Sequence, residues 1–89
     1  MKKLLLVAMM AGFASTAAFA AAKCEVHPKD QWIKEADFKK KLEADGYTIK
    51  KFKVSGDCYE MYGKTKDGKK AEIYFDTVSG KAVKSEIGN

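Results

Sequence analysis

The spacing of apolar residues is helical in the first part of the chain that follows the N-terminal segment. Phe38 and Leu42 lie four positions apart, so they share one face of a helix, while the lysines between them point elsewhere. Glu35 suits the positive end of the helix dipole, and Gly46 suits the left-handed residue that ends many helices. The pattern predicts one helix of about three turns at residues 35–45.

After this helix the apolar residues alternate with polar ones, as they do in strands. The expected strands are residues 47–54, 58–65, 71–76 and 81–87, and Asp or Gly residues lie between them. The alternation changes parity near Lys50 and Lys51, which predicts a β-bulge. Short connections make neighbouring strands antiparallel. We therefore expect an α+β fold, with one helix packed on a three- to four-stranded antiparallel meander sheet.

The N-terminal segment has the pattern of a secretory signal peptide. Two lysines precede an uncharged apolar stretch, and the small residues Ala18 and Ala20 fit the site read by signal peptidase. The apolar run is about half of the roughly 20 residues that a spanning helix needs. We predict that residues 1–20 are a signal peptide cleaved near Ala20, with Ala22 as the alternative, and that no stable membrane anchor remains.

The expected mature chain has an extended arm at residues 21–29 and a domain at residues 30–89. Its two cysteines are Cys24, in the arm, and Cys58, in the domain. Export to the periplasm or the medium places them in an oxidising compartment, where one pair most simply forms a disulfide. Closing a loop of about 35 residues stabilises a fold by roughly 3–4 kcal/mol. We therefore predict a structural disulfide.

The charge pattern argues against a nucleic-acid partner. The formal net charge is +5, but every basic residue is a lysine, whereas base and phosphate recognition favours arginine. Lysines interleaved with acidic residues are typical of a soluble surface. Binding to anionic cell-surface polymers is a further interpretation, which needs the lysines gathered on one face; the sequence spreads them over the helix and the strands.

The usual catalytic groups are missing. His27 is the single histidine, and a disulfide leaves no free thiol to pair with it. The spacing Cys24-x-x-His27 occurs in metal sites, but a structural zinc site needs four ligands, so we expect His27 to lie on the surface. Glu60, Glu72 and Asp76 fall on the polar face of the expected sheet, where carboxylates are usually solvated. We predict no enzyme activity, no cofactor and no metal site.

One turn carries a clear structural signature. In the segment that runs from Asp76 to Gly80, the Asp side chain can accept backbone N–H bonds, and Gly80 can adopt a positive φ. We expect Asp76, Ser79 and Gly80 to reverse the strand.

Several short motifs are similar to those of PepSY domains. They are Trp32-Ile33, Gly46-Tyr47, Asp67-Gly68-Lys69, Ile73-Tyr74-Phe75-Asp76 and the closing Asp-x-x-Ser-Gly turn. Over residues 30–84 the chain resembles the small, stand-alone secreted form, with Ser79 where members usually carry Thr. PepSY domains occur in the propeptides of secreted metallopeptidases and in envelope proteins. The resemblance implies a regulator or inhibitor of peptidases that acts by protein binding, and it implies no catalytic or cofactor residues.

We therefore expect a secreted, non-catalytic binding module whose partner is another envelope or secreted protein. Tyr62 and Tyr74, on the polar face of the sheet, are the expected binding surface together with an exposed sheet edge. Ordinary cross-strand packing is the alternative role for these tyrosines. The alternative function is a small-ligand or metal-responsive periplasmic protein that uses His27, nearby carboxylates and, if reduced, the cysteines.

Overall fold

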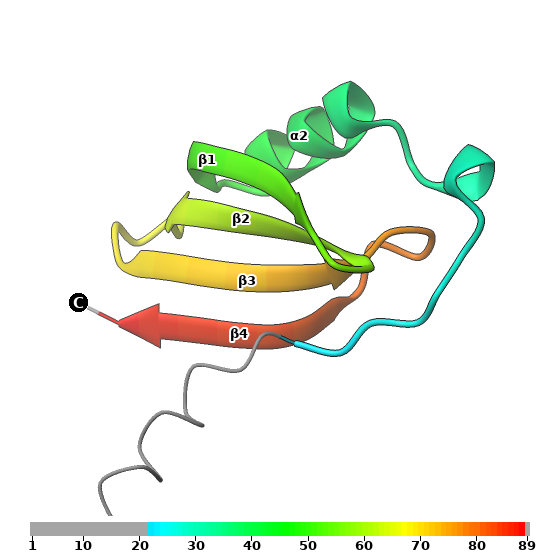
Figure 1. The fold of residues 1–89 in the computed structure, drawn as a ribbon. Coiled ribbons are helices and arrows are strands. Elements are labelled where there is room, and N and C mark those ends of the chain that lie inside the picture. The colour runs from blue at the N-terminus through cyan, green and yellow to red at the C-terminus, as the bar shows by residue number, and fades with distance from the viewer. Residues whose placement is uncertain (1–21, 89) are drawn as a thin grey trace, which may run out of the picture.

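The computed structural model describes residues 22–88, so the predicted signal peptide lies outside the described residues. The elements are a 3-10 helix η2 (Lys29–Gln31), the helix α2 (Glu35–Ala44), and the strands β1 (Thr48–Ser55), β2 (Cys58–Lys64), β3 (Lys70–Asp76) and β4 (Ala82–Gly88). The strands form one antiparallel sheet in the order β1-β2-β3-β4. The predicted α+β fold, one helix on an antiparallel meander, is confirmed, and Figure 1 shows α2 packed across the sheet near β1. Within residues 22–88, no helix combines the length and the apolar character needed to cross a bilayer.

Helix α2 forms because one narrow stripe of its surface is apolar. Phe38 and Leu42 lie one turn apart on that stripe and are 1% and 3% exposed, while the neighbouring positions are polar. The helix ends at Ala44 and is followed by Asp45 and then Gly46, whose φ of 105° few other residues adopt. The N–H of Gly46 donates to the carbonyl of Glu43, and the N–H of Tyr47 donates to that of Leu42. These bonds satisfy carbonyl groups at the helix end and turn the chain into β1.

Aromatic rings form the centre of the core between α2 and the sheet. The buried apolar cluster consists of Phe38, Leu42, Tyr59, Met61, Ala71, Ile73 and Phe75. The ring of Phe38 meets that of Phe75 edge-on, with centroids 5.0 Å apart, and stacks on that of Tyr59 at 5.6 Å. The Tyr59 hydroxyl donates to the carbonyl of Ile33 at 2.7 Å, so a polar group in the core keeps a partner.

The predicted bulge lies in β1. The register between β1 and β2 shifts between Ile49 and Lys51, where the alternation changes parity in the sequence. Gly63 of β2 pairs with Ile49 next to this shift. A Cβ atom at Gly63 would overlap the carbonyl oxygen of Thr48, so the two backbones approach closely only because this residue is glycine.

The two faces of the sheet differ in what covers them. Helix α2 covers the apolar face, which contributes the core residues of β2 and β3. The opposite face, which we call the open face, carries Glu60 and Tyr62 of β2 and Glu72 and Tyr74 of β3. The expectation that these carboxylates are solvated is wrong for Glu60, which is 2% exposed. Glu60 lies on an inner strand of the sheet, where side chains of the neighbouring strands enclose it.

Candidate functional site

The N-terminal arm is fixed at two points, one of which is on the sheet. Cys24 and Cys58 form a disulfide with a Cα–Cα distance of 5.4 Å, as the two cysteines of the sequence predict. Cys58 begins β2 and is fully buried. Further along the arm, the indole N–H of Trp32 donates to the carbonyl of His27 at 2.9 Å. The arm residues between these points are therefore held beside the end of the sheet (Figure 1).

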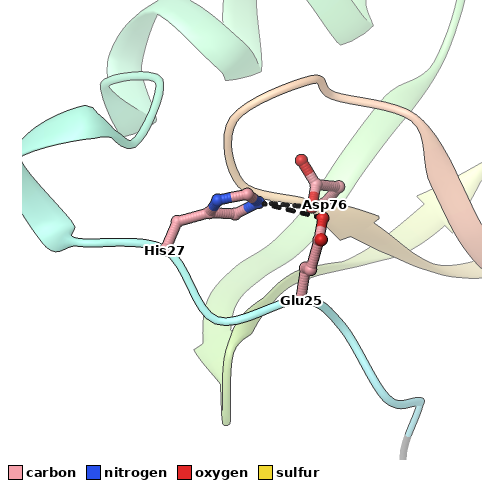
Figure 2. Close-up of side chains that lie close together, drawn as sticks. All are labelled: Glu25, His27 and Asp76. Carbon is pink, nitrogen blue, oxygen red and sulfur yellow. Dashed lines mark hydrogen bonds and ion pairs between the residues drawn. The ribbon is translucent and has the colours of Figure 1, made fainter.

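Between these points, the arm places two side chains against the C-terminal end of β3 (Figure 2). His27 Nε2 lies 2.9 Å from Asp76 Oδ1 and 3.7 Å from Glu25 Oε1. The side chains of His27 and Asp76 are 21% and 13% exposed, whereas that of Glu25 is 80% exposed. We call Glu25, His27 and Asp76 the arm cluster.

Asp76 is held rigidly by the turn that it begins. Its Oδ2 accepts the backbone N–H groups of Ser79 at 2.7 Å and Val78 at 3.0 Å. The turn closes with Gly80, which has a φ of 76° and donates to the Asp76 carbonyl. Hydrogen bonds from the Ser79 backbone, from the His27 side chain and from the Val78 backbone favour the ionised carboxylate and lower the pKa of Asp76 to about 2.

The arm cluster combines residues that sequence reasoning treated separately. The sequence assigned Asp76 to a structural turn and His27 to the surface, and it gave Glu25 no role. The structure brings His27 and Asp76 together although 49 positions separate them. One signal in the sequence pointed to this site, namely the predicted disulfide between Cys24 and Cys58. Because Cys58 pairs with Asp76 between β2 and β3, this disulfide brings the arm to the end of β3 where Asp76 lies.

The open face places the two predicted binding residues diagonally across β2 and β3. Tyr62 pairs with Glu72, and Tyr74 pairs with Glu60. The Tyr74 hydroxyl donates to Glu72 Oε2 at 3.2 Å. Both tyrosine rings are partly buried and have lysine ammonium groups above them, at 5.9 Å and 6.0 Å from the Tyr62 ring and at 6.0 Å from the Tyr74 ring.

Glu60 is the electrostatic centre of the open face. Its Oε1 lies 3.8 Å from Lys53 Nζ, and its buried Oε2 has no hydrogen-bond partner in the part of the chain that the structure describes. Burial, followed by interactions with Glu60 and Glu72, raises the pKa of Tyr74 to about 12. Hydrogen bonding to Glu60 and then to Glu72 likewise raises the pKa of Tyr62, and hydrogen bonding with Glu60 lowers the pKa of Glu72. The two phenols therefore keep their protons beside the carboxylates.

A hollow of about 720 Å³ adjoins the open face at the end of the sheet where β4 finishes. Tyr62 and Glu72 line it, together with Lys64, Lys70 and Glu86. Tyr74 does not line the hollow, so the two predicted residues contribute differently: Tyr62 forms part of its wall, and Tyr74 lies beside it next to Glu60.

Comparisons with known proteins give one family. No curated protein and no solved structure matches the chain significantly. A family model described as the peptidase propeptide and YPEB domain matches residues 4–86, nearly the whole chain. The helix and antiparallel sheet agree with the α+β fold that the sequence pattern predicted. The chain belongs to the PepSY family.

Proposed function

We propose that the mature chain is a secreted, non-catalytic module that binds another envelope or secreted protein through the open face and regulates it. Membership of a family of generally non-catalytic propeptide-like and inhibitor-like modules supports this proposal, and it makes a peptidase the preferred partner. The observation that carries it is the group formed by Tyr62 and Tyr74 around Glu60 on the face of the sheet that α2 leaves uncovered.

The surroundings of Glu60 suit a protein partner. Tyrosines supply large, rigid and amphipathic contact areas at little entropic cost, and they are enriched among residues that dominate binding energy. Tyr62 and Tyr74 flank the carboxylate, and the hollow beside Tyr62 has room for a partner side chain. The apolar face already packs against α2, so the open face is the broad surface that remains for a partner.

Photocrosslinking tests this surface directly in the exported protein. A photoreactive residue at position 62 should trap the partner in the periplasm, and mass spectrometry identifies it. With the purified partner, Tyr74→Ala should weaken binding at least about tenfold, since a central aromatic contact is worth 1–2 kcal/mol or more. The matched control is Lys40→Ala on the exposed side of α2, which should bind as the unchanged chain does. Equal affinities for the two variants would rule out the open face.

Regulation and export are tested separately. If the trapped partner is a peptidase, adding the purified mature chain should lower its cleavage rate, and Tyr74→Ala should restore that rate. A peptidase that binds the chain but cleaves equally fast would contradict regulation while leaving binding intact. For export, the N-terminus of the protein taken from the periplasm should follow Ala20 or Ala22; a chain that still begins at Met1 would contradict it.

A further inference from the structure

We propose that the arm cluster binds a divalent transition-metal ion, with Zn²⁺ as the expected occupant. Its ligands are the imidazole of His27 and the carboxylates of Glu25 and Asp76, whose donor atoms all lie within 4.8 Å of one another. The sequence predicted no metal site as the first choice, because a structural zinc site needs four ligands, and it left a metal-responsive protein using His27 and nearby carboxylates as the alternative. Glu25 lies two positions before His27 in the chain. The fold supplies the missing ligand from β3.

The distances fit a single ion. Zinc binds imidazole nitrogen and carboxylate oxygen at about 2.0–2.2 Å, so ligand atoms around a tetrahedral ion lie about 3.3 Å apart. The two distances from His27 Nε2, 2.9 Å to Asp76 Oδ1 and 3.7 Å to Glu25 Oε1, bracket this value. The oxygens of Glu25 and Asp76 lie within 4.8 Å of each other, and movement of the exposed Glu25 side chain would complete the geometry.

A cation also resolves an electrostatic conflict in the cluster. One Nε2–H group can donate to one carboxylate at hydrogen-bond distance, and Asp76 occupies that position. Glu25 Oε1 approaches the same nitrogen at 3.7 Å, so two carboxylates converge on a single proton. A divalent ion in place of that proton would neutralise both carboxylates.

The protein holds the ligands in place before any ion arrives. The disulfide fixes Cys24, directly before Glu25, and the Trp32 indole holds the carbonyl of His27. The backbone N–H groups of the turn occupy Asp76 Oδ2, which leaves Oδ1 to face the arm. Such outer contacts orient metal ligands and strengthen binding.

The donor set selects the type of ion. One imidazole and two carboxylates suit zinc, nickel and copper(II), whereas calcium and magnesium prefer oxygen donors alone. Three protein ligands leave a further position for water, as in zinc sites that are not purely structural. We therefore expect moderate affinity, reversible occupation and no binding of Ca²⁺.

The single histidine allows a site-specific test. The tag-free, disulfide-bonded mature protein is titrated with ZnCl₂, while NMR follows the ring nitrogens of His27. We expect saturable one-to-one binding with a large shift at Nε2, and no response to CaCl₂. The absence of any His27 shift at millimolar Zn²⁺ would overturn the proposal.

Two variants distinguish Zn²⁺ binding at the arm cluster from binding to His27 alone. Glu25→Gln removes an exposed ligand that the fold does not need, and it should weaken Zn²⁺ binding about tenfold in calorimetry. The control Glu43→Gln, at an exposed position of α2, should bind as the unchanged protein does. Unchanged affinity in Glu25→Gln, or undiminished binding in His27→Gln, would show that the ion binds elsewhere and would overturn the assignment.

Discussion

Reduction of the Cys24–Cys58 disulfide should remove a large share of the stability of the domain. The bond joins residues 34 positions apart, and it links the arm to a fully buried position at the start of β2. Reduction changes no side chain other than the two sulfurs, so it is a cleaner perturbation than substitution. It tests whether the crosslink acts by restricting the unfolded chain.

The expected magnitude follows from the loop length. Closing a loop of this size costs the unfolded chain about 13 cal/mol/K of entropy, which corresponds to about 4 kcal/mol at room temperature. Folded domains of this size have a free energy of unfolding of about 3–10 kcal/mol. The His27–Asp76 contact and the Trp32 hydrogen bond exist only in the folded chain, so they do not restrict the unfolded chain as the disulfide does. We expect a loss of about 2–4 kcal/mol.

Urea unfolding with and without a phosphine reductant measures this loss. The fluorescence of Trp32 reports on unfolding, because this single tryptophan packs edge-on against Tyr59 with centroids 5.4 Å apart. The reduced protein should unfold at a markedly lower urea concentration, and reoxidation should restore the midpoint. A double Cys→Ser variant should not respond to the reductant. A difference below about 1 kcal/mol between the oxidised and reduced forms would refute the loop-entropy reasoning.

Two further predictions concern the sheet. Gly63→Ala should lower the free energy of unfolding by about 2–3 kcal/mol or more, because the new methyl group overlaps a backbone carbonyl of β1. Gly88→Ala, in open space, is the control and should change it by less than about 0.5 kcal/mol; equal urea midpoints would contradict the close approach at the bulge. In an ultraviolet titration that follows ionisation of the tyrosines, the unchanged protein should show a step near pH 12 that Tyr74→Phe lacks, because the pKa of Tyr74 is raised from 10.0 to about 12. If the step lost in Tyr74→Phe instead lies near pH 10, the burial of this phenol beside carboxylates is contradicted. Because the folded pKa of Tyr74 is raised, its contribution to stability is present below pH 10 and is lost as the pH rises towards 12.

Much of the fold is a local property of the sequence. The four-residue spacing of Phe38 and Leu42, followed by Gly46, specifies a helix and its end. The parity change in residues 47–54 specifies the bulge, since a strand can turn its apolar residues to one side only by inserting a residue. Short turns are long enough to connect adjacent strands only in an antiparallel arrangement. These outcomes depend on neighbours in the chain, so the sequence was sufficient to predict them.

The chemistry of the two sites depends instead on residues that only folding brings together. Glu60 lies on the expected polar face, yet its burial depends on neighbours contributed by β1 and β3, which no spacing within β2 reveals. The contact of His27 with Asp76 spans 49 positions and needs both the crosslinked arm and the turn after β3. Burial and side-chain distance are properties of packed surfaces, whereas the sequence pattern reports only the direction in which each side chain leaves its own element.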